Sequence, residues 1–137
     1  MAHPMTVEQM NAFCNNTLIS HLGIEFTEFG ENFIKAKMPV DARTVQPLGL
    51  LHGGASAALV ETLGSVGSIL QLDSQTQSAV GLEVNTNHIR SVKSGYVYGT
   101  ATALHLGRRT HVWEVRIIDD QDRLTATGRL TMMIVNR

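Results

Sequence analysis

The chain has 137 residues, 43% hydrophobic and 17% charged, and its 11 Lys and Arg nearly balance its 12 Asp and Glu at a formal net charge of −1. This length favours one domain, residues 1–137, that buries enough surface to fold without disulfides or metal. The near-zero net charge argues against a nucleic-acid binder. The single cysteine, Cys14, excludes an internal disulfide and a Cys-rich zinc site.

The sequence also lacks targeting and membrane signals. No run approaches the roughly 18 apolar residues of a membrane span, and the first residues lack the basic and apolar regions of a signal peptide. We therefore expect a cytoplasmic protein without membrane partners.

The first third of the chain predicts two short helical segments and a hairpin. Thr6 and Gln9 have the spacing of a capping box before a helix at residues 7–14, and a second turn follows near residues 17–21. Alternating side chains predict strands near residues 24–27 and 33–38. Residues 40–51 have no sustained period and are predicted to form a long loop.

The middle of the chain predicts one long helix, residues 54–72, with an apolar stripe of Leu59, Leu63, Val66 and Leu70. Gly64 and Gly67 each cost about 1 kcal/mol relative to Ala inside a helix, so we expect a sheet to pack closely there. Four strands follow, at residues 79–88, 95–106, 110–118 and 124–135. This order predicts an α+β fold with an antiparallel sheet around one helix.

The segment with the clearest chemical character runs from Gln46 into the long helix. The chain enters the helix at Gly54, where free backbone N–H groups and the helix dipole favour an anion or a developing oxyanion. Glu61 lies two turns further along the same face, and Ser65 follows one turn later. Because Glu61 is the only ionisable residue of this helix, a nucleophile or general base is favoured over an ordinary surface carboxylate.

The neighbouring residues leave alternatives open. His52 fits a cap of the loop and a direct chemical role equally well. His52 and Glu61 are nine residues apart with no third ligand nearby, so no metal is expected. The two glycines lack the Lys-Ser/Thr of a phosphate loop, so no nucleotide cofactor is expected either.

A second polar group of residues lies at two strand ends. One end carries His88, Arg90, Ser91 and Lys93, and the other carries His105, Leu106, Gly107, Arg108 and Arg109. These residues are either solvated loop positions or a compact site for one phosphorylated ligand, which needs only a few Arg contacts.

Two motifs show a resemblance to a known family. With Gln46-Pro-Leu-Gly-Leu-Leu-His52-Gly-Gly54 before Glu61-Thr-Leu-Gly-Ser65, and Val80-Gly-Leu-Glu-Val-Asn-Thr-Asn-His88 further on, the chain closely resembles hotdog-fold acyl-CoA thioesterases over nearly its whole length. The resemblance is closest to the 1,4-dihydroxy-2-naphthoyl-CoA hydrolases of menaquinone synthesis and the proofreading thioesterases of enterobactin synthesis. It implies a six-stranded antiparallel sheet wrapped around one long central helix. It also implies homodimers or dimers of dimers, with active sites between subunits.

The resemblance assigns roles residue by residue. Glu61 would be the nucleophile or general base, and the Gly54 N–H would polarise the thioester carbonyl, with Gln46 and His52 positioning that carbonyl. Ser65 would orient water or the carboxylate. The substrate-binding positions would be Val66 and Gly81 for the acyl group, and His88, Arg90, Ser91, Leu106, Gly107, Arg108 and Arg109 for coenzyme A.

The expected function is hydrolysis of an aryl or medium-chain acyl-CoA, or of an acyl-carrier-protein thioester, without a cofactor. Two alternatives stay open: a non-catalytic acyl-CoA binding module, and a hydratase or dehydratase on the same fold. A pure binder has no use for a desolvated carboxylate beside a thioester, so Glu61 favours the enzyme.

Overall fold

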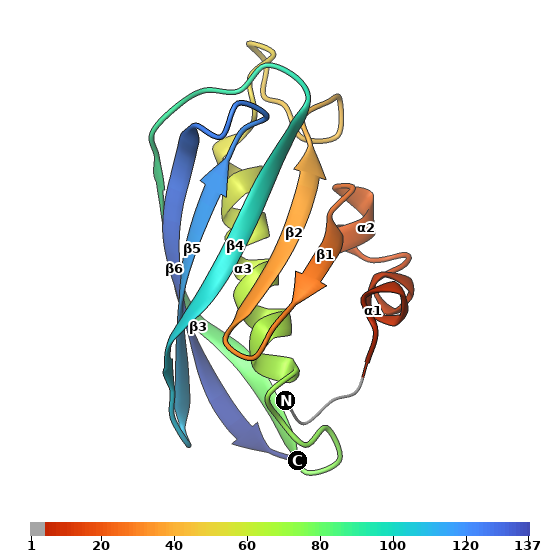
Figure 1. Cartoon of the computed structure of the whole chain (residues 1–137), viewed down its shortest axis with the longest axis vertical. Helices are drawn as coiled ribbons and strands as arrows, with labels where there is room; N and C mark the ends of the chain where they lie inside the picture. The colour runs from red at the N-terminus through yellow and green to blue at the C-terminus, as the bar shows by residue number, and fades with distance from the viewer. Residues whose placement is uncertain (1–4) are drawn as a thin grey trace.

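The computed structural model describes residues 5–137, and its elements follow the predicted order (Figure 1). The elements are α1 (Val7–Phe13), α2 (Leu18–His21), β1 (Glu25–Phe29), β2 (Phe33–Pro39), α3 (Gly53–Ile69), β3 (Gln77–His88), β4 (Tyr96–Leu106), β5 (Thr110–Ile118) and β6 (Leu124–Asn136). The long helix ends three residues before the predicted end. After Ile69 the backbone forms i→i+3 hydrogen bonds of the 3₁₀ type. The Gln71 N–H donates to the Ser68 carbonyl and the Leu72 N–H donates to the Ile69 carbonyl.

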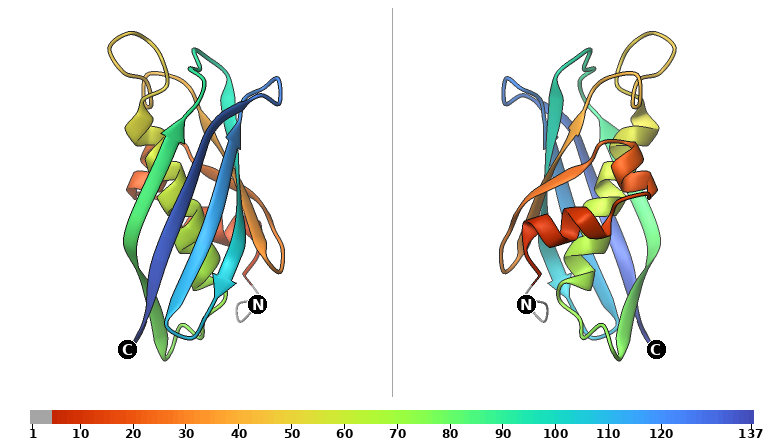
Figure 2. Two further views of the ribbon diagram at one scale, coloured as in Figure 1. Left: turned by 90° about the vertical axis from the view of Figure 1, so that its left-hand side faces the viewer. Right: turned by 90° about the vertical axis from the view of Figure 1, so that its right-hand side faces the viewer.

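The six strands form one antiparallel sheet in the order β1-β2-β4-β5-β6-β3. Figure 2 shows this sheet curving around α3, with α1 and α2 on the open side of the helix. The predicted α+β class and central helix are confirmed. Because β3 pairs only with β6, β3 is one edge of the sheet. No helix within residues 5–137 is long and apolar enough to cross a membrane.

The core lies between α3 and the concave face of the sheet. Its largest fully buried side chains include Leu59 and Leu63 of α3 and Trp113 of β5. The helix glycines are explained as predicted: an added Cβ would lie 2.3 Å from a Leu130 methyl at Gly64 and 2.9 Å from the Trp113 ring at Gly67.

Helix α1 is held by a capping box at its N-terminus and by side-chain hydrogen bonds to β1. The predicted capping box is present, since Thr6 Oγ1 accepts from the Gln9 N–H and Gln9 Oε1 accepts from the Thr6 N–H. The Asn11 side chain makes two hydrogen bonds to the backbone of Phe26, at 3.0 and 2.8 Å. Cys14 is buried, and burial raises the pKa of its thiol, as expected for a packed cysteine.

Candidate active site

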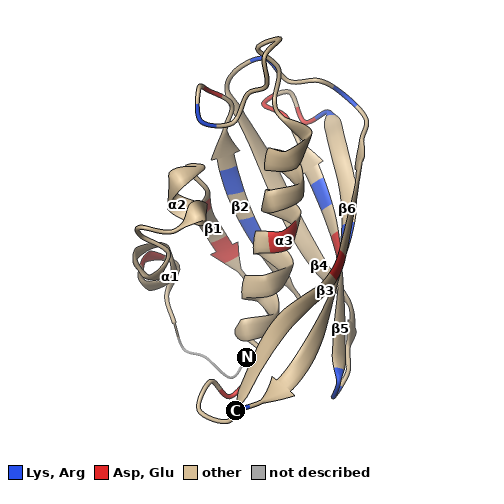
Figure 3. Cartoon of the chain, turned by 180° about the vertical axis from the view of Figure 1, so that it is seen from behind, with Lys and Arg blue, Asp and Glu red and all other residues tan. Residues whose placement is uncertain are grey.

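The exposed face of α3 carries the predicted catalytic residues. Gly54 and Ile69 are exposed at its two ends, and Glu61 and Ser65 are partly exposed between them, whereas the opposite face is buried. Figure 3 shows α3 with one acidic position and no basic one. The helix therefore presents a single carboxylate on an otherwise uncharged face, as the sequence predicts.

Glu61 lacks the partners that usually accompany a partly buried carboxylate. Its Oε2 atom is buried and has no hydrogen-bond donor among residues 5–137, and burial raises the pKa of Glu61 above its ordinary value. The carboxylate lies against Gly81 of β3, where an added Cβ would be 2.7 Å from Oε1. Glu61 and Gly81 are thus brought together, although they are 20 positions apart in the chain.

The other predicted residues of α3 have different surroundings. The Ser65 hydroxyl lies 3.8 Å from the sulfur of Met132, and this is the only hydrogen-bond contact of its side chain among the described residues. Val66 is buried in the hydrophobic core at 6% exposure.

The N-terminus of α3 differs from the expectation of a free oxyanion donor. His52 is the N-cap, and its Nδ1 accepts the Gly54 N–H at 2.7 Å. His52 therefore has the capping role that was one of its two expected roles, and its imidazole occupies the Gly54 N–H. For Gly54 to polarise a carbonyl, the imidazole must first turn away.

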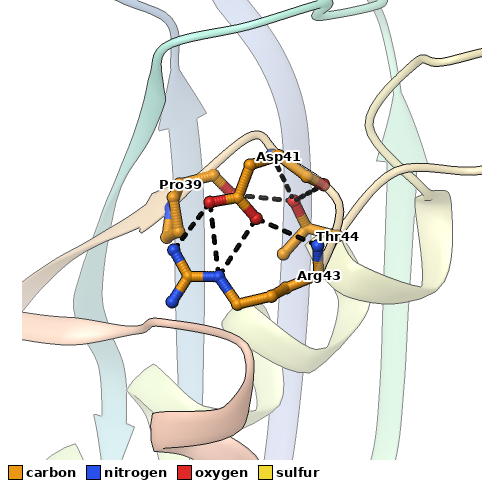
Figure 4. A network of polar contacts seen from close by, with 4 residues as sticks. All are labelled: Pro39, Asp41, Arg43 and Thr44. Carbon is orange, nitrogen blue, oxygen red and sulfur yellow. Dashed lines mark hydrogen bonds and ion pairs between the residues drawn. The ribbon is translucent and has the colours of Figure 1, made fainter.

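The loop before α3 is anchored by a compact polar network, drawn in Figure 4. The Arg43 guanidinium pairs with Asp41 at 2.6 Å, and this contact lowers the pKa of Asp41 to about 2. Thr44 is buried and donates to the Pro39 carbonyl at 2.7 Å. These contacts fix the path of the chain from β2 towards Gln46. Sequence reasoning missed them, since Asp-Ala-Arg-Thr matches no functional motif.

Gln46 lies in a pocket of about 260 Å³ next to the start of α3. Its Oε1 accepts the Leu48 N–H, so its amide nitrogen is the atom of this side chain that can donate to a ligand. His88, Arg90 and Ser91 line the same pocket, as do Ser56 and Thr125, which no sequence signal indicated. The imidazole of His88 lies against Gly53, where an added Cβ would be 3.0 Å from Nε2. We call this the His88 pocket.

Arg108 and Arg109 do not reach the His88 pocket within one chain. They lie with Gly107 in the turn between Leu106, the last residue of β4, and Thr110, the first residue of β5. The sheet register places Thr110 level with Met133 and Val80. Val80 precedes His88 by eight residues, or about 26 Å of strand. The basic residues around Arg90 and those around Arg108, which the sequence suggested as one phosphate site, are therefore at opposite ends of the sheet.

Residues 5–137 contain no group of three His, Cys, Asp or Glu side chains that could hold a metal ion. The chemistry on offer is a carboxylate of raised pKa, a helix N-terminus and a few Arg and amide donors. This set suits acyl transfer or hydrolysis more than redox chemistry.

A sheet wrapped around one helix, with a carboxylate on the exposed helix face, defines a hotdog-fold hydrolase of the thioesterase type. The profile of the family described as Thioesterase superfamily matches residues 48–126. The chain belongs to this superfamily.

Individual relatives agree with this assignment. The proofreading thioesterase EntH of Cronobacter turicensis is 49% identical over 131 residues, covering 96% of this chain and 95% of the relative. A solved thioesterase from Haemophilus influenzae is 46% identical with a TM-score of 0.95, covering 98% of this chain and 94% of that one. A mutant thioesterase from Pseudomonas aeruginosa is 47% identical with a TM-score of 0.96, covering 98% and 97%. The chain is thus an enzyme of thioester hydrolysis.

Proposed function

We propose that the chain hydrolyses the thioester of an acyl-CoA or an acyl carrier protein, and that Glu61 supplies the essential carboxylate. The observation that supports this most directly is the buried Glu61 Oε2 atom without a donor. A carboxylate left unpaired in this way is costly, and such groups concentrate at functional sites. The relative named a proofreading thioesterase favours the second of the two expected likenesses over the menaquinone enzymes.

The reaction needs no metal, because a thioester carbonyl is electrophilic and a thiolate leaves readily. As general base, Glu61 takes a proton from water while the water oxygen bonds to the carbonyl carbon. The C–S bond then breaks, and the thiolate receives the proton as the free acid forms. As nucleophile, Glu61 itself bonds to the carbonyl carbon, the C–S bond breaks and the thiolate leaves as a mixed anhydride forms; water then hydrolyses this anhydride to the free acid and the Glu61 carboxylate, and its proton goes to the thiolate. In a single turnover in labelled water, label in the Glu61 carboxylate identifies the second route.

The spacing of Gly54 and Glu61 favours a site built from two subunits. Seven helical residues separate them by about 10 Å, and Glu61 is turned towards β3. A nucleophile and an oxyanion donor that act on one carbonyl lie within about 8 Å of each other. We therefore assign Glu61 and Gly54 of one active site to different chains.

The β3 edge provides the surface for this assembly. Eleven of the twelve residues of β3 pair with β6, the other edge of β3 has no partner strand among residues 5–137, and Val80, Leu82 and Val84 are 40–54% exposed. A long edge strand with one free edge and exposed apolar side chains is suited to pairing with the same strand of a second copy.

A particular register of two β3 strands would bring the halves of the site together. Glu61 lies against Gly81, and the α3 N-terminus lies against His88. If two copies pair antiparallel about the point between Val84 and Asn85, Gly81 of one chain comes opposite the partner subunit's His88. The turn that carries Arg108 then comes level with the partner subunit's Arg90. Both groups of basic residues could then contact the same coenzyme A molecule.

The first test is Glu61→Ala, with Glu28→Ala as the matched control on the exposed β1 strand. Loss of a catalytic base lowers kcat by about 10²–10⁴-fold, so Glu61→Ala should lose nearly all release of free thiol from acyl-CoA while keeping its far-ultraviolet spectrum. Near-normal turnover by a folded Glu61→Ala protein would refute the proposal. Bound but unhydrolysed acyl-CoA in the wild type would favour the binding module, and hydration of an enoyl-CoA would favour the hydratase.

The second test is subunit complementation. Gly54→Pro removes the Gly54 N–H in the first turn of α3, where the helix backbone does not need it, and its ring displaces the His52 imidazole, since a Cβ at Gly54 would be 2.8 Å from Nδ1. Each homo-oligomer, Glu61→Ala or Gly54→Pro, should be inactive. A mixed dimer of the two variants should regain about half of wild-type activity per dimer, because one of its sites keeps both Glu61 and Gly54. A mixed dimer without activity would refute the shared site.

The proposed coenzyme A contact of Arg90 is tested separately. Arg90→Ala should raise KM for acyl-CoA with a smaller effect on kcat, because it removes ground-state binding of phosphate. Arg116→Ala, on the exposed face of β5, is the control. An unchanged KM in Arg90→Ala would contradict the assignment.

A further inference from the structure

A second pocket lies at the C-terminal end of α3, opposite the end that carries the His88 pocket. It has a volume of about 350 Å³ and a mainly apolar lining that includes Met5, Met10, Phe13, Ile69, Leu70 and Leu72. Figure 2 shows α1 crossing over α3 on the open side of the fold, above the start of β3. We call this cavity the α1–α3 pocket. Its volume is in the range of small-molecule sites, about 300–1,000 Å³.

The α1–α3 pocket lies on the same helix face as Glu61. Ser65 and Ile69 follow Glu61 at steps of four residues, so the three positions line one side of α3. Ile69 lines the pocket and is about 12 Å from Glu61 along the helix axis. On β3, Gly81 lies against Glu61, and Ala79 is the next position on the same side of the strand towards the pocket, so both of these positions carry small residues.

We infer that the α1–α3 pocket receives the far end of the acyl group, and that the enzyme selects straight, apolar acyl chains of about ten carbons or more. This inference rests on the proposed role of Glu61. With the thioester carbon at Glu61, a chain that covers about 12 Å needs about nine to ten bonds, because an extended alkyl chain advances about 1.25 Å per C–C bond. Acyl groups of two to four carbons, and a benzoyl group, end before they reach the pocket.

The wall contributed by α1 is held in place independently of any ligand. The two hydrogen bonds between Asn11 and the Phe26 backbone tie α1 to the sheet, and Met10 is buried beneath the helix. Phe13, at the lip of the pocket, is 74% exposed. An aromatic ring this exposed gains burial when an apolar chain lies against it, so Phe13 favours a long acyl group over water.

The experiment is a chain-length series. We compare kcat/KM for acetyl-, butyryl-, octanoyl-, decanoyl- and benzoyl-CoA in the wild type, in Ile69→Trp, which fills the pocket, and in Leu18→Trp. Leu18 is the matched control, because it is an exposed apolar residue of α2 outside the pocket. Each buried methylene contributes up to about fourfold, so decanoyl-CoA should exceed butyryl-CoA by at least tenfold in the wild type and in Leu18→Trp.

Ile69→Trp should abolish that advantage and leave butyryl- and benzoyl-CoA within about twofold of wild type. Equal rates for butyryl- and decanoyl-CoA in the wild type, or an Ile69→Trp variant that lowers all substrates alike, would overturn the inference. Phe13→Ala provides a second variant at a solvent-exposed position, and it should weaken decanoyl-CoA alone.

The two proposals can fail separately. A chain-length preference that Ile69→Trp removes, in a protein whose Glu61→Ala variant stays active, rejects the role of Glu61 and keeps the pocket. If the wild type hydrolyses no acyl-CoA, calorimetric binding of decanoyl-CoA to the wild type but not to Ile69→Trp supports the pocket, and equal binding rejects it.

Discussion

Gly81→Ala tests whether activity depends on the position of the Glu61 carboxylate, because the substitution moves the carboxylate without removing it. The added Cβ would lie 2.7 Å from Glu61 Oε1, whereas an ordinary contact needs about 3.4 Å, so the carboxylate must move by about 0.7 Å. A misplacement of about 1 Å at a reacting group costs up to about 100-fold in rate. We therefore expect kcat to fall by about 10- to 100-fold.

The same substitution should not harm the fold. Gly81 has no positive φ, and replacing Gly by Ala inside a strand stabilises it by about 0.5–1 kcal/mol, while the flexible end of Glu61 can give way. Urea denaturation should thus show equal or higher stability alongside reduced turnover.

A double-mutant cycle provides the control for Gly81→Ala. In the Glu61→Ala background, Gly81→Ala should cause no further loss of activity, because there is no carboxylate left to displace. Wild-type kcat in Gly81→Ala would refute the reasoning that the observed position of the carboxylate matters.

Three further predictions concern the core, the pH profile and the loop. In the core, Ser68 Oγ accepts from Trp113 Nε1 at 2.8 Å and lies 3.0 Å from His111 Nδ1. Ser68→Ala leaves both ring nitrogens without this partner, so it should lower the free energy of unfolding in urea by about 2–4 kcal/mol. An unchanged denaturation midpoint would contradict this. Burial raises the pKa of Glu61 above 4.5, so activity that needs the ionised carboxylate should fall with decreasing pH in a limb centred above 4.5, and a limb centred below that value would argue against Glu61 as its origin. Because the pKa of Asp41 is lowered to about 2 by Arg43, the loop should hold at pH 4 and loosen as pH falls towards 2; Asp41→Asn should remove this dependence in hydrogen exchange of residues 40–52 and raise KM at neutral pH.

Local signals in the sequence were sufficient for most of the fold. The capping box at Thr6 and Gln9 and the alternation of the strands depend on neighbouring residues, and the structure confirms them. The close approach of the sheet at Gly64 and Gly67 was also predictable, because a helix tolerates two interior glycines only for a packing reason.

The parts of the site that sequence could not provide are those set by distant contacts. Sequence spacing cannot tell whether His52 caps the Gly54 N–H or leaves it free, since both arrangements use the same residues. The separation of Arg90 from Arg108 follows from the sheet register. The α1–α3 pocket joins Phe13 to Ile69, which have no common motif.

The tight packing on α3 also determines where its carboxylate can be. Leu130 and Trp113 press onto the helix backbone at Gly64 and Gly67. If α3 slid or rotated by one residue, positions with side chains would meet these two groups and overlap with them. The position and rotation of α3 on the sheet are therefore fixed. The position of Glu61, three residues before Gly64, is fixed with them. Two missing side chains on the buried face thus fix the position of the Glu61 carboxylate on the exposed face.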